Sequence, residues 1–149
     1  MNTLFFRAKN GIKYTGREIN RINREISGKT VRFALAFPET YELGMSSLGF
    51  KILYEIGNLV EDIYTERVIC PDPDFEAILR ENKQELFSLE TRTPLKKFHM
   101  IGFSVNYEMN FTNILTILDL SNIPLKSEDR GNDHPIIIAG GASIANPEP

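Results

Sequence analysis

The hydrophobic positions of this chain change their spacing several times, and each spacing predicts a different kind of element. Apolar runs of strand length occupy residues 31–37, 65–70, 100–105 and 135–139, and a weaker run occupies residues 86–89. Runs of this length that end at proline or at a polar turn are typical of strands buried on both faces. The pattern therefore predicts about five strands.

Helical spacing separates these runs. After a helix start at Ser46 or Ser47, apolar residues recur at intervals of three and four, namely Leu48, Ile52, Leu53, Ile56 and Val60. Asp74 is placed to cap a short helix, and a third helix carries Phe111, Ile114, Leu115 and Leu118. We expect these stripes to face the core. Strands that alternate with helices indicate an α/β, doubly wound, Rossmann-like or flavodoxin-like fold with a mainly parallel sheet.

The first 30 residues follow another pattern and are expected to form an extension to the domain of residues 31–149. Thr15 and Glu18 have the capping-box spacing, and Gly28 stands where a helix C-cap belongs. Isoleucines lie between them at helical intervals, at Ile19, Ile22 and Ile26. The segment therefore predicts a short basic amphipathic helix, with a possible short strand at residues 4–6 before it.

Composition narrows the class of protein. A length of 149 residues suits one domain, and 42% hydrophobic residues exclude a disordered chain. The apolar runs are too short to span a bilayer, and the N-terminus lacks the pattern of a secretory signal. The lone cysteine, Cys70, cannot form an internal disulfide, and we interpret it as a small buried apolar residue. We expect a cytoplasmic protein that does not bind membranes.

Charge is distributed unevenly along the chain. The first 32 residues contain eight basic and two acidic residues, whereas the net charge of the whole chain is −3. A basic segment of this kind can bind RNA, or it can fold onto an acidic body or a neighbouring domain. No aromatic residues interleave the charges between Arg17 and Lys29, which disfavours RNA. We expect no DNA partner.

Three loops are candidates for ligand binding, because ligands of open parallel sheets bind at the carboxyl ends of the strands. They span residues 38–47, 104–108 and 140–143, and they combine glycines with polar side chains. The candidate binding residues are Glu39, Tyr41, Gly44, Ser46, Ser104, Asn106, Tyr107, Gly140, Gly141 and Ser143. Each also has a structural interpretation: Glu39 and Glu42 can complement a helix dipole, and the glycine pair can simply end a strand.

The residues of these loops resemble a known family. Residues 34–49, 101–108, 138–141 and 146–149 resemble, in order, an uncharacterised bacterial family of radical SAM proteins with an N-terminal cobalamin (B12)-binding-like domain. The resemblance covers nearly the whole chain from about Tyr14 onward. It implies that this chain is the front piece of a longer protein, truncated before the last elements of its domain.

The resemblance also assigns roles to single positions. Cobalamin domains carry Asp-x-His-x-x-Gly after the first strand, and residues 39–44 fall on this motif with Glu39 for Asp and Tyr41 for His. Their Ser-x-Leu motif corresponds to Ser104–Asn106, with Asn for Leu, and Gly140 and Gly141 match the Gly-Gly pair. Without the histidine, this loop offers cobalt no imidazole, so cobalamin would need another lower-face arrangement or would not bind.

Radical SAM catalysis would belong to the parent protein alone. The family's [4Fe–4S] cluster, which cleaves S-adenosylmethionine, requires three cysteines, and this chain has only Cys70. We therefore expect no catalytic residue here and a C-terminal radical SAM domain as partner.

Two functions remain open. In the first, the nucleotide tail of cobalamin enters between residues 39–47 and 140–143, and the corrin lies over residues 104–107. In the second, the domain is a degenerate, cofactor-free docking module whose basic helix binds RNA or a neighbouring domain. A free-standing flavodoxin-like protein is a weaker third interpretation.

Overall fold

The chain folds around a four-stranded sheet in which all neighbouring strands are parallel. This computed structural model describes residues 2–145, and the side chains of residues 4–145. Its strands are β1 (Val31–Phe37), β2 (Ile63–Ile69), β3 (Met100–Ser104) and β4 (Ile136–Gly140), in the order β2-β1-β3-β4. The predicted flavodoxin-like α/β fold is confirmed, and the strand order reverses between β1 and β3. Residues 146–149, which contributed to the family resemblance, lie outside the described part.

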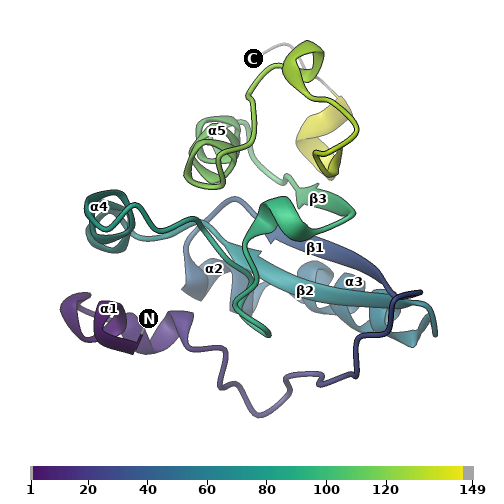
Figure 1. Cartoon of the computed structure of the whole chain (residues 1–149), viewed down its shortest axis with the longest axis horizontal. Helices are drawn as coiled ribbons and strands as arrows, with labels where there is room; N and C mark the ends of the chain where they lie inside the picture. Colours follow the sequence, from purple (N-terminus) through teal and green to yellow (C-terminus); the bar gives the residue numbers. More distant parts are fainter. Residues whose placement is uncertain (1, 146–149) are drawn as a thin grey trace.

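Helices cover the sheet unevenly. The helices are α1 (Asn2–Arg7), α2 (Tyr41–Ser46), α3 (Leu48–Leu59), α4 (Pro73–Glu81) and α5 (Asn110–Leu120) (Figure 1). Ala34 and Ala36 of β1 belong to the core cluster that includes α1, α4 and α5. Leu35 and Phe37 alternate with them and pack with Phe50 of α3 on the other face. On this second face, Ile136 and Ile138 of β4 remain 61% and 46% exposed.

The prediction of a weak strand at residues 86–89 is wrong, but this segment has a structural role. Its backbone forms an isolated bridge between Phe87 and Pro94, and the N–H of Leu89 donates to the carbonyl of Arg67 at 2.8 Å. The segment thereby covers the free edge of β2. Edge strands expose unpaired backbone groups, so this cover explains why β2 is almost entirely buried.

The N-terminal segment differs most from its prediction. Residues 4–6 belong to α1 instead of a strand, and residues 16–28 run as an extended loop along one side of the sheet (Figure 1). The predicted capping box does not form, because Thr15 Oγ1 donates to the Ile12 carbonyl and Glu18 accepts from Arg67 and Tyr41. Tertiary polar contacts have replaced helical ones.

Arg24 shows what the extended loop gains. Its guanidinium donates to the carbonyls of Asn58, Val60, Glu61 and Ile63 at 2.6–3.0 Å, where α3 ends and β2 begins. The last carbonyls of a helix have no partner within the helix, so a guanidinium there satisfies them and complements the helix dipole. The basic side chain predicted on a helix therefore caps another helix.

Two details of the predicted helices also change. The helix α4 starts at Pro73 after Asp72, and Asp74 Oδ2 accepts from the Lys9 N–H instead of capping α4. The aliphatic stripe predicted as the core face of α3 is exposed, with Leu48 at 71% and Ile56 at 54%. The buried face of α3 carries Phe50, Tyr54 and Asn58. Among the described helices, none is long and apolar enough to cross a membrane.

Two adjacent phenylalanines test the docking of α1. Phe5 is buried, with its ring 6.0 Å from the ring of Phe75, whereas Phe6 is 89% exposed. We expect Phe5→Ala to lower the free energy of unfolding by about 3 kcal/mol, because it removes a buried aromatic ring. The matched control Phe6→Ala should change it by less than about 0.5 kcal/mol. Urea denaturation of both variants measures the difference, and equal effects would contradict the packing of α1.

Candidate functional site

The loop that follows β1 is fixed by α5 from one side of the sheet. Asn110 Nδ2 donates to Glu39 Oε1 at 2.9 Å, and Asn113 Nδ2 donates to the Pro38 carbonyl at 3.0 Å. Residues 41–46, predicted as part of this loop, form α2, and Glu42 in the first turn of α2 pairs with Lys13 at 2.5 Å. Glu39 and Glu42 therefore have separate partners, which removes the geometry of a paired acid and base.

An apolar groove lies beside α3, on the sheet face that α3 covers only in part. We call it the α3 groove; its volume is about 720 Å³. Its floor comes from β1, β3 and β4, and one wall is the aliphatic stripe of α3. The lining includes Phe33, Leu35, Ser47, Gly49, Ile52, Leu53, Ile56, Gly102, Ser104, Asn106, Ile138, Gly140 and Gly141.

The α3 groove brings together part of the predicted site. Of the ten candidates, Ser104, Asn106, Gly140 and Gly141 line it. Sequence reasoning missed Gly49 and the stripe of α3, which was interpreted as core. Ser47 lay in the candidate loop of residues 38–47 but was not among the ten chosen residues. A usable signal was present, because α3 is apolar on two faces and has only two charged residues.

The other candidates lie elsewhere or serve the fold. Gly44 is buried, and a Cβ there would come within 2.6 Å of Ile69 Cδ1. Ser46 Oγ donates to the Leu43 carbonyl inside α2, and Ser143 is buried behind the strand ends. Tyr107 is 67% exposed and does not line the α3 groove. Glu39, as described, is held by α5.

Tyr41 is directed away from the α3 groove. Its hydroxyl donates to Glu18 Oε1 at 3.0 Å, in a second hollow between α2, α3 and the N-terminal loop. Burial and the neighbouring Glu18 carboxylate raise the pKa of Tyr41 to about 12. The phenol therefore stays protonated at neutral pH, which makes it a poor metal ligand.

Gly141 has a structural reason to be glycine. Its φ is +128°, and a Cβ at this position would lie 2.1 Å from the Val105 carbonyl oxygen. The N–H of Val105 in turn donates to the Gly140 carbonyl at 2.7 Å, so the ends of β3 and β4 are in contact. Gly140 itself has open space at its Cβ position. Of the pair, Gly140 is the position where a side chain would enter the groove without moving the backbone.

A buried ionic network joins β1 and β2 to the turn of residues 88–91, which lies against the edge of β2. Glu66 is fully buried and accepts from the Arg32 guanidinium, from Ser88 Oγ at 2.7 Å and from Thr91 Oγ1 at 2.6 Å. Glu90 accepts from the N–H and Nε of Arg67, both at 2.6 Å. Glu66 and Arg67, which stand side by side in a mostly apolar strand, were the sequence signal for this network.

Cys70, just beyond β2, is buried as predicted, and burial raises the pKa of its thiol to about 12.

The strand order defines a flavodoxin-like α/β domain, and an open apolar groove lies beside its switch point. Residues 49–149 match the family described as the N-terminal region of radical SAM proteins. The chain belongs to this family. A search of the curated proteins and a search of the solved structures found no significant match.

The contact between Tyr41 and Glu18 predicts a pH-dependent stability. Tyr41→Phe should lower the free energy of unfolding by about 1 kcal/mol at pH 7. This is less than a fully buried hydrogen bond to a carboxylate contributes, because Tyr41 is only half-buried. Folding raises the pKa of Tyr41, so its protonated form stabilises the protein below the unfolded value of about 10. This contribution is lost as the pH rises from about 10 to 12.

Urea denaturation of both proteins at several pH values measures this. The exposed Tyr107→Phe serves as the matched control and should be neutral at pH 7. A difference between Tyr41→Phe and the wild type that does not shrink above pH 10 would contradict the assignment.

Proposed function

We propose that this chain is the non-catalytic N-terminal module of a radical SAM protein, and that its α3 groove holds the nucleotide tail of cobalamin. The observation that carries the proposal is the groove itself, an apolar hollow of about 720 Å³ at the topological switch point. Ligands of doubly wound folds bind at this position. The module would then present its ligand to a C-terminal radical SAM domain of the same polypeptide in the cytoplasm.

The residues of the groove suit a planar, largely apolar group. Gly49, Gly102 and Gly140 leave its floor and rim without side chains, and Phe33 supplies an aromatic surface. Ser104 and Asn106 add polar groups at the carboxyl end of β3, where they can donate to a ligand. The wall of α3 would exclude water from the bound group. These features fit the base of the nucleotide tail.

The lower face of the cobalt does not fit the pattern of histidine-ligated cobalamin domains. Tyr41 stands at the histidine position, but its hydroxyl is bonded to Glu18 and directed out of the groove. Cobalamin held in this groove would therefore take no ligand from Tyr41. When bound, cobalamin supplies a cobalt centre that can carry a methyl group or assist radical chemistry. The residues of this chain would hold and orient it.

The second candidate function is a cofactor-free docking module, and the exposed stripe of α3 favours it. Leu48, Leu53 and Ile56 are 71%, 47% and 54% exposed, which makes α3 an apolar surface open to a neighbouring domain. The RNA branch of this hypothesis draws less support. The basic helix on which it depended is not formed, and Arg24 donates to backbone carbonyls of the domain.

An anaerobic titration with hydroxocobalamin, followed by the corrin spectrum, separates the two functions. We expect saturable binding by the wild type and at least about tenfold weaker binding by Gly140→Leu, whose side chain would fill the groove. Gly28→Leu is the matched control, since Gly28 also has open space at Cβ but does not line the groove.

Three outcomes are informative. Equal affinity of the wild type and Gly140→Leu would contradict placement in the α3 groove. Absence of binding by a wild type that is folded by circular dichroism would favour the docking module. Binding with a spectrum that changes in Tyr41→Phe would contradict the assignment of Tyr41 as a non-ligand.

A further inference from the structure

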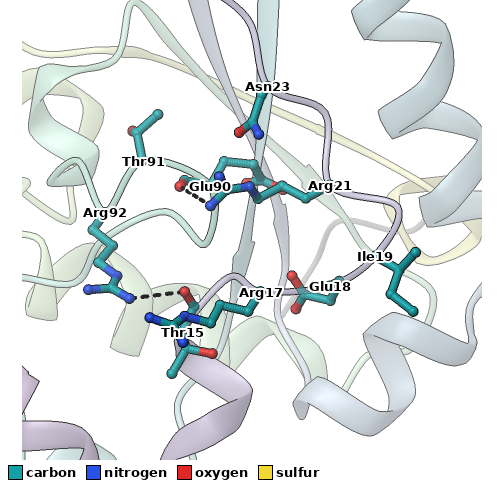
Figure 2. Close-up of a pocket in the computed structure, with 9 residues that line it drawn as sticks. All are labelled: Thr15, Arg17, Glu18, Ile19, Arg21, Asn23, Glu90, Thr91 and Arg92. Carbon is teal, nitrogen blue, oxygen red and sulfur yellow. Dashed lines mark hydrogen bonds between the residues drawn. The ribbon is translucent and has the colours of Figure 1, made fainter.

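A polar cavity lies between the N-terminal loop and the turn after Glu90, separate from the α3 groove. Its volume is about 600 Å³, within the usual range for small-molecule sites. Arg17, Arg21 and Arg92 line it, together with Glu18, Glu90 and smaller side chains (Figure 2). The α3 groove and this cavity share no residue.

The three arginines lack carboxylate partners. None of them forms an ion pair with any residue between positions 4 and 145. Among the described residues, Arg21 donates to the carbonyls of Gly16 and Glu90. Arg92 donates to the carbonyl of Thr15, and its guanidinium lies 5.0 Å from the centre of the Phe5 ring. In Figure 2, Arg92 and Arg17 both extend toward Thr15, and Arg21 extends across Glu90. The cavity thus concentrates positive charge that the carbonyl dipoles and the Phe5 ring compensate only in part.

The two carboxylates of the cavity are already engaged. Glu90 Oε1 bonds Arg67 Nε at 2.6 Å, and Glu18 Oε2 lies 3.2 Å from Arg67 Nη2. Counting Arg67 with the lining residues, four guanidiniums face two carboxylates, which leaves a surplus of two positive charges. A dianion would neutralise this surplus, and a phosphate group offers its oxygens to guanidinium forks.

Of the three arginines, Arg17 is the one whose position a structural contact does not explain among the described residues. Arg21 and Arg92 attach the N-terminal loop to the domain through their carbonyl contacts, so their presence has a structural explanation. Arg17 makes no hydrogen bond or ion pair within the described part of the chain, yet it lines the same cavity. Arg17 is exposed at the rim of the cavity, so its guanidinium donors are available to an anion that enters it.

From these contacts we propose that the cavity binds the phosphate group of a small phosphate monoester, with Arg17, Arg21 and Arg92 as its donors. Asn23 supplies a further polar group for the rest of the molecule. A small molecule fits better than RNA, because no aromatic side chain lines the cavity to stack a base. The proposal is independent of cobalamin binding in the α3 groove.

The test is isothermal titration of the full chain with ribose 5-phosphate and with inorganic phosphate, at constant ionic strength, with ribose as the uncharged control. We expect both phosphates to bind and ribose not to bind. Arg17→Gln should weaken both phosphates by about tenfold or more without lowering thermal stability, since Arg17 contributes no internal contact. Arg7→Gln is the matched control, because Arg7 is paired with Glu81 away from the cavity.

Lowering the pH through the second pKa of the phosphate monoester, about 6, should weaken the binding of ribose 5-phosphate, because the dianion becomes a monoanion. Unchanged affinity in Arg17→Gln would overturn the proposal, and so would an equal loss in Arg7→Gln. Absence of phosphate binding up to about 10 mM by the folded wild type would also overturn it. A single-stranded oligoribonucleotide that binds when both phosphates fail would overturn it in favour of RNA.

Discussion

Two buried carboxylates, Glu66 and Glu90, must each be paired with an arginine, and the rest of this structure depends on that constraint. A carboxylate removed from water is strongly destabilising unless cations and donors surround it. Glu66 obtains them from Arg32 of β1 and from Ser88 and Thr91, and Glu90 obtains them from Arg67 of β2. The turn after residue 86 must therefore stay against β2, where it also closes the sheet edge.

The same network explains why the N-terminal loop is not a helix. Arg67 extends past Glu90 to Glu18, and Glu18 also accepts from Tyr41, so the loop is tied to both β2 and α2. Capping-box spacing and isoleucine periodicity are local signals, each contributing about 1 kcal/mol or less to a helix. Several charge-assisted bonds to the domain outweigh them, and Ile19 is left fully exposed. A single sequence does not show which distant carbonyls a basic side chain will reach.

The strands and helices that follow from the pattern of buried apolar residues were predictable from the sequence. The segments whose structure depends on particular long-range contacts were not. The strands β1 to β4 and the helices α3, α4 and α5 follow from apolar runs and periodicity, within a few residues. Part of the groove lining was predictable, because Ser104, Asn106 and Gly140 lie at the carboxyl ends of strands, where the sequence analysis placed its candidate residues. The partners of Glu39 and Tyr41, on α5 and the N-terminal loop, depend on side-chain directions that spacing does not encode.

The two apolar faces of α3 bear on what the groove can recognise. Phe50 and Tyr54 use one face to pack on the sheet, and the opposite stripe, at Ile52 and Ile56, is left as the wall of the groove. An exposed aliphatic stripe opposite the packed face of a helix is typical of a surface that contacts a ligand or a neighbouring domain. The charged residues of the first loop are engaged elsewhere, which leaves Ser104 and Asn106 to supply polar recognition. In the proposed cofactor site, selection would therefore depend mainly on the shape and apolar surface of the ligand.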